Sequence, residues 1–339
     1  MKKKLFSLLL AAAMMASLVA CGNDSGNQTS NDNTNKTDTN KTDTSDSDET
    51  YEIGICQLVQ HEALDAATEG FKKALTDEFG DKVKFDEQNA QNDSATCATI
   101  VNSFVSKKVD LILANATPAL QAAANATADI PILGTSITEY GVALSLNDFN
   151  GTVGGNISGT CDLAPLDEQA EMIKEFCPDK KTVGILYCSG EPNSKYQADK
   201  VQESLEGLGY TVSIYTFTDT NDVSAVTTKC ASENEVMYIP TDNAAASNTE
   251  LIDSICSEKK IPVFAAEEGI AKGCGVATLT ISYYDLGYTT GQMAVKILKG
   301  ESDISQMAIE YAPATKKYVA SRCEALGLTV PEGYEAIEE

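Results

Sequence analysis

The chain is poor in the residues and motifs that enzymes use for catalysis. Its 339 residues include one histidine and no tryptophan. One histidine cannot build a multi-histidine metal site, and His61 has no G-x-S-x-G serine elbow that would place it in a hydrolase triad. No G-x-x-x-x-G-K-[ST] loop is present to hold nucleotide phosphates. We therefore expect no catalytic residue, no metal and no cofactor.

Basic side chains are also scarce. The chain has 25 lysines and arginines against 50 aspartates and glutamates, which gives a formal net charge of -25. A nucleic-acid partner requires clustered basic residues that neutralise phosphates. The composition therefore argues against nucleic-acid binding, and the acidity is more simply that of a solvated surface.

The first twenty residues have the composition of an export signal. Three lysines precede an apolar run, residues 5–20, that is too short and too rich in alanine to be a spanning helix. The sequence LVAC at 18–21 resembles the lipobox of bacterial lipoproteins, which implies cleavage before Cys21 and a lipid such as palmitate on its sulfur. The alternative is an ordinary secretory signal followed by a chance cysteine. We expect residues 1–20 to be a lipoprotein signal peptide.

Residues 22–50 contain no aliphatic or aromatic side chain. Such a segment cannot bury a core, so residues 21–50 are predicted to be a lipidated, disordered tether. A flexible polar coil of this length spans on the order of 30 Å. The tether would hold a globular body at the outer face of the cell membrane.

The chain has ten cysteines, of which nine remain if Cys21 carries a lipid. None forms a C-x-x-C pair, and their spacings match no zinc site. An odd number of cysteines cannot all pair, and a free cysteine behaves as a small buried hydrophobe. We expect the thiols to be mostly or wholly free, as would suit a reducing or anaerobic exterior.

A strand–turn–helix–strand unit occurs twice in the chain. Residues 109–136 read as an apolar strand, a helix with Thr117 as its N-cap and Pro118 as its first helical residue, and a strand after Ile-Pro. Residues 235–266 repeat this order, with a turn at Thr-Asp-Asn in place of Thr-Pro. Two similar α/β units in one chain predict two lobes with a cleft between them.

The two equivalent turns suggest what the cleft binds. Ligands of parallel α/β sheets bind beyond the C-terminal ends of the strands, so Thr117 and Asp242 would face each other. A helix N-terminus after Thr117 suits a carboxylate, and Asp242 suits an ammonium. The pair therefore predicts a zwitterion such as an α-amino acid. The alternative is that Thr117 and Asp242 only cap their helices.

Other candidates come from strand exits and aromatic side chains. His61 either lines the cleft or has a structural role at the start of the helix that follows it. The remaining exits contribute polar residues, namely Asn92, Ser136, Thr138 and Glu267. With no tryptophan present, tyrosines are the candidate walls, although a lone tyrosine is more often core packing; they are Tyr140, Tyr187, Tyr283 and Tyr284.

Four segments together carry a family resemblance. IGICQLVQHEALDAATEGF at 53–71, ANATPALQAAANAT at 114–127, IPTDNAAAS at 239–247 and YYDLGYTTGQMAVKILKG at 283–300 resemble the substrate-binding lipoproteins of ABC importers. The branch they resemble includes proteins that bind tryptophan, tyrosine or phenylalanine. The similarity covers nearly all of residues 51–331.

The resemblance implies an α/β structure with the two-lobed periplasmic-binding-protein type I fold. That fold has two doubly wound parallel sheets, a ligand cleft between them and three crossovers. The Gly-rich segment 151–159 is interpreted as a crossover, so we expect residues 51–155 and 281–302 in the first lobe. Residues 156–280 and 303–339 would form the second.

By motif, the resemblance implies that six residues contact the ligand, namely Gln57, His61, Thr117, Pro118, Asp242 and Asn243. The strand exits and the tyrosines supply six further candidate ligand-binding residues, namely Asn92, Ser136, Thr138, Tyr187, Glu267 and Tyr284.

The predicted function is capture of an amino acid outside the cell and its delivery to an ABC permease, and we expect the amino acid to be aromatic. Because the chain lacks a phosphate loop, the ATPase must be a separate subunit. The same fold could instead bind a nucleoside or a sugar, or act as a surface sensor. An enzyme such as a tethered esterase or racemase is the weakest alternative.

Overall fold

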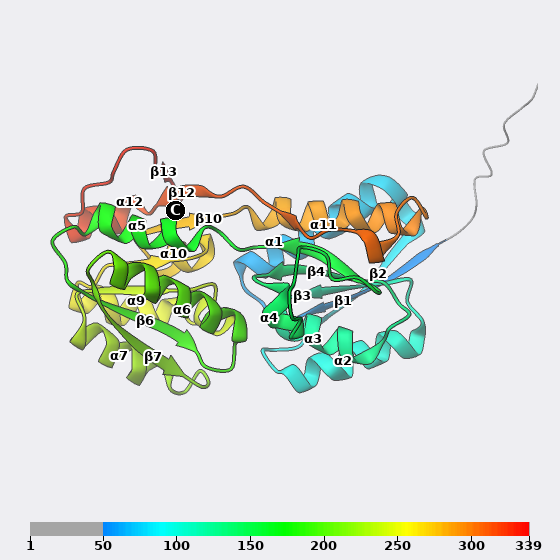
Figure 1. Cartoon of the computed structure of the whole chain (residues 1–339), viewed down its shortest axis with the longest axis horizontal. Helices are drawn as coiled ribbons and strands as arrows, with labels where there is room; N and C mark the ends of the chain where they lie inside the picture. The colour runs from blue at the N-terminus through cyan, green and yellow to red at the C-terminus, as the bar shows by residue number, and fades with distance from the viewer. Residues whose placement is uncertain (1–49, 339) are drawn as a thin grey trace, which may run out of the picture. The chain divides into compact units, whose positions relative to one another are not determined.

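A computed structural model describes residues 50–338 of the chain. These residues form an α/β structure with two sheets, each covered by helices on both faces (Figure 1). The predicted signal peptide and nearly all of the predicted tether lie outside the described residues. Within the described range, no helix is both long and apolar enough to cross a membrane.

The first sheet and its helices are called the first lobe. Its strand order is β11-β5-β4-β3-β1-β2, and every pair is parallel. The strands are β1 (Tyr51–Gln57), β2 (Val83–Asn89), β3 (Leu111–Asn115), β4 (Ile132–Ile137), β5 (Ile157–Cys161) and β11 (Glu310–Tyr311). The helices are α1 (Glu62–Phe79), α2 (Ser94–Lys107), α3 (Thr117–Ala126), α4 (Tyr140–Leu144) and α11 (Tyr283–Leu298).

The second sheet and its helices form the second lobe. Its order is β13-β12-β10-β9-β8-β6-β7, parallel except for the antiparallel pair β10 and β12. The strands are β6 (Thr182–Cys188), β7 (Thr211–Phe217), β8 (Val236–Ile239), β9 (Val263–Ala265), β10 (Ala277–Thr280), β12 (Thr315–Tyr318) and β13 (Glu335–Ala336). The helices are α5 (Leu166–Phe176), α6 (Pro192–Gly207), α7 (Val223–Glu233), α8 (Asn243–Ala246), α9 (Thr249–Lys259), α10 (Glu268–Cys274) and α12 (Ala320–Leu326).

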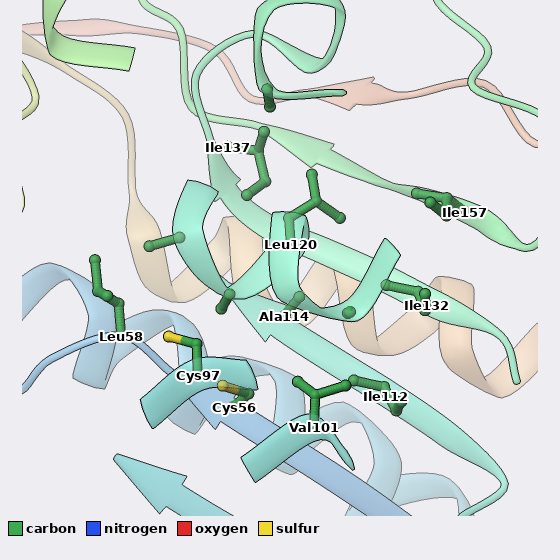
Figure 2. Packing of buried hydrophobic residues seen from close by; sticks show 14 of the residues in the cluster. Cys56, Leu58, Cys97, Val101, Ile112, Ala114, Leu120, Ile132, Ile137 and Ile157 are labelled. Carbon is green, nitrogen blue, oxygen red and sulfur yellow. The ribbon is translucent and has the colours of Figure 1, made fainter. Parts of the chain in front are cut away.

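The core of the first lobe follows from the alternation of side chains along β1. Ile53 and Ile55 pack on one face of the sheet with Phe71 from α1. Cys56 belongs to the opposite face, where α2 and α3 supply Leu120 and other apolar side chains (Figure 2). Successive residues of a strand point to opposite faces, so a strand buried on both sides reads as a continuous apolar run.

Helices α1 and α11 cover the same face of the first sheet and cross at very short range. A Cβ atom at Gly70 would collide with the backbone of Tyr284, and one at Gly287 with the backbone of Ala67. Glycine is therefore required at these positions for the two helices to approach. This contact attaches α11 to the first lobe.

The lobe boundaries differ from those predicted at two places. We expected the first crossover at 151–159, but β5 (Ile157–Cys161) pairs with β4, so the first sheet continues to Cys161. We also assigned all residues after 302 to the second lobe, but β11 returns to pair with β5. The chain therefore crosses after Cys161, before α11, and after β11, which gives the three crossovers that the resemblance implied.

The start of α3 also differs from the prediction. The helix begins at Thr117 itself, and its N-cap is Ala116, with a φ of 86°. Pro118 is the second helical residue, where its missing N–H removes no helical hydrogen bond. The Thr117 side chain therefore does not cap α3. Asp242 does cap α8, because its Oδ1 accepts from the Ala245 N–H at 2.8 Å.

Candidate ligand site between the lobes

A polar cavity lies between the lobes, beyond the C-terminal ends of their parallel strands. The first lobe lines it with His61, Ala63, Leu64, Ser136, Thr138, Asp162 and Tyr283, the first residue of α11. The second lobe lines it with Asn193, Thr241, Asp242, Asn243, Ala246 and Glu267. The cavity is narrow, with a volume of about 10 Å³. The lobes are therefore close together in this structure.

Three side chains of the cavity carry a buried polar atom without a hydrogen-bond partner. They are Ser136 Oγ, Asp162 Oδ1 and Asn193 Oδ1, out of six such atoms in the described part of the chain. Buried polar atoms almost always have a partner, and each one left unpaired costs about 1–3 kcal/mol. Their convergence on one cavity is typical of a ligand site.

Asp162 is the carboxylate with a free oxygen. It follows β5 directly, is 4% exposed, and accepts a hydrogen bond from the Tyr283 phenol to Oδ2 at 2.9 Å. Burial raises the pKa of Asp162 to about 6, although the Tyr283 hydrogen bond opposes the rise. The carboxylate is therefore mostly ionised at neutral pH, and its Oδ1 can accept from a cation.

The other buried carboxylates at the cavity are occupied by backbone groups. Asp242 Oδ2 accepts from the Cys188 N–H at 2.7 Å and Oδ1 from the Ala245 N–H. Glu267 caps α10 through the N–H groups of Gly269 and Ile270. Burial raises the pKa of Glu267 to about 7 and also raises that of Asp242, where the charge of Glu191 adds to the effect. These carboxylates shape the wall, and we find Asp162 better placed than Asp242 to bind an ammonium.

One hydrogen bond across the cavity joins the two lobes. His61 Nε2 lies 3.2 Å from Asn243 Oδ1. Glu191 orients the Asn243 side chain. The Glu191 carboxylate accepts hydrogen bonds from Asn243 Nδ2 at 2.7 Å and from the Asn243 backbone N–H at 3.0 Å. Burial lowers the pKa of His61, so its ring is neutral and can donate one proton to Asn243.

The N-terminus of α1 opens onto the cavity. His61 is its N-cap residue, but the His61 side chain makes no capping hydrogen bond, and Ala63 and Leu64 of the first turn line the cavity. The first N–H groups of a helix have no partner within the helix, and they carry the positive end of its dipole. An anionic group can therefore be bound here, beside the unpartnered Ser136 hydroxyl. We had assigned this role to α3.

The structure brings half of the predicted site residues to this cavity. These are His61, Ser136, Thr138, Asp242, Asn243 and Glu267. The other half are Gln57, Asn92, Thr117, Pro118, Tyr187 and Tyr284, and none of them lines it.

Each of these six has another environment. Gln57 is held within its own lobe by Asp65 and Thr68, and it lines a separate surface hollow with Tyr284. Asn92 is exposed in a left-handed turn, and Tyr187 packs in the core of the second lobe. Thr117 is buried at the start of α3, and Pro118 lines a hollow between α2 and α3.

The polar residues that the sequence analysis missed include Asp162, Asn193 and Thr241, which line the cavity, and Glu191, which supports Asn243. Asp162 lies after a strand that we had interpreted as a crossover, so it was not recognised as a strand exit. Asn193 and Glu191 lie at the start of α6, where a polar exit after β6 was the available signal. The described residues contain no cluster of three or more histidine, cysteine, aspartate or glutamate side chains suited to a metal.

Two α/β lobes with a polar cavity between them are the architecture of the type I periplasmic-binding fold. The model of the ABC transporter substrate binding protein family matches residues 52–332. The chain belongs to this family, whose members bind solutes rather than catalyse reactions.

Individual relatives agree with this assignment. A tyrosine-binding protein from Clostridioides difficile (strain R20291) is 39% identical over 307 residues, covering 88% of this chain and 85% of the relative. A crystal structure from Streptococcus pneumoniae, in complex with L-Trp, is 31% identical with a TM-score of 0.81 and covers 85% of this chain and 100% of that one.

A ligand-free structure is also similar to this chain. A ligand-free, open substrate binding protein from Clostridium difficile is 40% identical over 85% of this chain and 99% of its own, but its TM-score is only 0.65. The L-Trp complex fits better despite its lower identity.

Proposed function

We propose that this protein captures an aromatic amino acid between its lobes and delivers it to an ABC permease. The observation that carries the proposal is the convergence of three unpartnered polar atoms, on Ser136, Asp162 and Asn193, in the interlobe cavity. The preference for an aromatic side chain is supported by the relatives, one named as tyrosine-binding and one crystallised with L-Trp.

The ammonium of the amino acid is assigned to the Asp162 side of the cavity. Asp162 Oδ1 and Asn193 Oδ1 are both acceptors without a donor, and an ammonium has three N–H groups to offer. A charge-assisted hydrogen bond to a carboxylate is stronger than a neutral one. Since no lysine or arginine lines the described cavity, no side chain competes for this position.

The carboxylate of the amino acid is assigned to the start of α1. The uncapped N–H groups of the first turn and the Ser136 hydroxyl are donors on the first-lobe side. A ligand with an anionic and a cationic end would satisfy both groups of atoms at once. A sugar or a nucleoside has no carboxylate for this position, so the amino acid is favoured.

These atoms also explain why closure would depend on the ligand. Closing the lobes without a bound partner would leave three buried polar groups unsatisfied, at about 1–3 kcal/mol each. A ligand that pairs with all three removes that cost only in the closed arrangement. It therefore shifts the population of the protein toward closure.

The location and partners belong to the same proposal. The LVAC sequence at 18–21 supports export and attachment of a lipid to Cys21, which would place the protein at the outer face of the membrane. The permease and the ATPase would be separate chains. Labelling of cells with a palmitate analogue tests the anchor: wild type should be labelled, and Cys21→Ala should not.

Isothermal titration calorimetry with matched ligands tests the binding site. L-tyrosine, L-tryptophan or L-phenylalanine should bind, whereas tyramine, without the carboxylate, and 3-(4-hydroxyphenyl)propionate, without the amine, should bind far more weakly. Asp162→Asn should lower affinity at least tenfold, whereas the exposed Asp167→Asn should not. Binding of a nucleoside or a sugar, with none of any amino acid, would reject the proposal.

A further inference from the structure

A second cavity lies within the second lobe, at the opposite end of its strands from the interlobe cavity. It has a volume of about 250 Å³ and is bounded by α9, α10 and α12 and by the segments that lead into β9 and β10. Val263 is the first residue of β9, and Val276 directly precedes β10, so this cavity lies at the N-terminal ends of these parallel strands. We call it the α12 cavity; its lining includes Ile261, Val263, Val276, Leu326, Lys260 and Arg322.

The walls of the α12 cavity are apolar. Besides its four aliphatic side chains, two cysteines complete the lining. The Cys274 thiol donates to the Ile270 carbonyl at 3.3 Å, and the Cys256 sulfur lies 3.9 Å from the Met237 sulfur. Both thiols therefore have partners outside the cavity and present it with an apolar surface. Water is poorly bound in such a space, which favours an apolar ligand group.

The volume of the cavity sets the size of that group. An apolar cavity of about 150 Å³ is sufficient to bind benzene, which has six carbon atoms. By that scale, the α12 cavity has room for roughly eight to ten carbon atoms. It can therefore hold a medium-length hydrocarbon chain.

Arg322 lies at this cavity in a fixed orientation. Its Nε donates to Asp253 Oδ1 at 3.0 Å, and its Nη1 and Nη2 donate to the carbonyls of Lys272 and Gly273, each at 2.7 Å. A guanidinium has five N–H groups, so two remain after these three hydrogen bonds. Because α9 and α10 already hold the side chain, binding an anion would cost little side-chain entropy.

Lys260 adds a second positive charge. It ends α9 in a left-handed conformation, with a φ of 54°, and this turn brings both Lys260 and Ile261 to the cavity. Asp253 compensates the charge of Arg322, whereas Lys260 takes part in none of the ion pairs between described side chains. No aspartate or glutamate belongs to the described lining. The α12 cavity is therefore net positive, in a chain whose formal charge is -25.

We propose that the α12 cavity is a second ligand site, which binds a monocarboxylate with a linear hydrocarbon chain of about eight carbons. The chain would fill the apolar walls, and the carboxylate would pair with Lys260 and the remaining N–H groups of Arg322. An arginine binds a carboxylate through parallel N–H groups, which makes it selective for this anion. This inference concerns a different part of the second lobe and does not depend on the identity of the interlobe ligand.

Isothermal titration calorimetry of the full chain tests the chemistry of the site. The probe is octanoate, with acetate, 1-octanol and octylamine as matched compounds that lack the chain, the charge or its negative sign. Octanoate should bind with one molecule per chain. Each matched compound should bind roughly tenfold more weakly or worse, because it lacks either the apolar burial or the charge-assisted hydrogen bonds.

Variants test the location. Ala325 lines the cavity on the exposed side of α12, so Ala325→Phe should fill the space and abolish octanoate binding. Ala320→Phe, at an exposed position of the same helix outside the lining, should leave binding unchanged. Lys260→Gln should weaken octanoate binding about fivefold without affecting 1-octanol, whereas Lys259→Gln should change neither. Circular dichroism melts confirm that each variant is folded.

The outcome is separable from the test of the interlobe site. Ala325→Phe should bind the amino acid as wild type does, and Asp162→Asn should bind octanoate as wild type does. The proposal is overturned if millimolar octanoate does not bind to wild type. It is also overturned if Ala325→Phe and Lys260→Gln bind octanoate unchanged, or if Asp162→Asn abolishes octanoate binding.

Discussion

The phenol of Tyr283 donates a hydrogen bond of 2.9 Å to Asp162 Oδ2, and this bond connects two of the three crossovers. Asp162 follows β5 at the first crossover, and Tyr283 begins α11 just after the second. The carboxylate that we assign to the ligand ammonium therefore lies where the chain passes between the lobes. Its orientation depends on a residue 121 positions later in the sequence.

The first prediction concerns Tyr283→Phe. Removing the phenol takes away the hydrogen bond that stabilises the Asp162 carboxylate and lowers its pKa. A hydrogen bond to a charged group contributes about 1.5–3 kcal/mol, so affinity for the amino acid should fall roughly tenfold or more at pH 7. Calorimetry measures this loss directly.

The pH profile distinguishes this role from simple packing. Affinity of the wild type should fall as the pH drops through about 6, because Asp162 then takes up a proton. In Tyr283→Phe the fall should begin at a higher pH, and in Asp162→Asn it should be greatly reduced. His61, Asp242 and Glu267 also face the cavity, so the comparison between variants is the informative measurement. An unchanged profile in Tyr283→Phe contradicts the assignment.

The second prediction is that the protein without ligand becomes less stable as the pH rises. Burial raises the pKa of Asp162 to about 6 and that of Glu267 to about 7. In the unfolded chain these acids ionise near pH 4, so between about pH 4 and 7 the folded state binds more protons. Their contribution to the free energy of unfolding is therefore full below about pH 4 and is lost as the pH rises through 6 to 7.

Glu267→Gln isolates one part of this effect. Thermal unfolding followed by circular dichroism should show a smaller fall in melting temperature between pH 5 and 8 than in wild type. The amide keeps one oxygen to accept from the N–H groups that begin α10. The matched change at exposed Glu258 should leave the slope unaltered, and equal slopes in the two variants would disprove the prediction.

The third prediction separates two contacts that both bridge the lobes. Lys272 Nζ and Glu62 Oε1 form an ion pair of 3.0 Å at the surface, with side chains 42% and 57% exposed. Exposed ion pairs contribute about 0–1 kcal/mol, so Glu62→Gln should reduce affinity less than about fivefold, and less again in high salt.

Asn243→Ala should have a much larger effect. It removes the partner of His61, and it takes from the buried Glu191 the hydrogen bond that the Asn243 side-chain amide donates, although the backbone N–H of residue 243 remains. A buried carboxylate that loses its hydrogen bonds costs several times more than an exposed ion pair. Calorimetry and thermal unfolding of the two variants check the ranking; a larger loss from Glu62→Gln would contradict it.

Much of the fold could be predicted from local sequence. The helix predicted to follow His61 is present as α1, which has apolar residues at helical spacing and acidic residues in its first turn. Asp242 was identified at a helix start because a capping aspartate satisfies backbone N–H groups within three residues. These features depend only on residues that are close together in the sequence, so they can be predicted from the sequence alone.

The parts that were missed depend on distant contacts. Ala116 is the N-cap of α3 and has a positive φ, which cannot be recognised from an alanine in the sequence. The sequence therefore pointed to Thr117 as the N-cap. The strand β5 contains Gly159 at a φ of 147°, where β4 and Tyr140 approach so closely that a Cβ would not fit. Such a strand reads as a glycine-rich linker, which concealed Asp162 at its end.

The last prediction concerns the contact between α1 and α11. A Cβ at Gly287 would overlap the backbone oxygen of Ala67, which cannot move without displacing α1. Overpacking of a tight contact costs about 1–3 kcal/mol, and a backbone clash should lie at the upper end, so Gly287→Ala should lower the melting temperature by several degrees. Gly207→Ala is the matched control, because nothing lies within 4 Å of its Cβ and Gly207 ends a helix. Alanine has the higher helix propensity, so the control should be neutral or stabilising. If the two variants unfold alike in a thermal melt, the close crossing of α1 and α11 does not exist in solution.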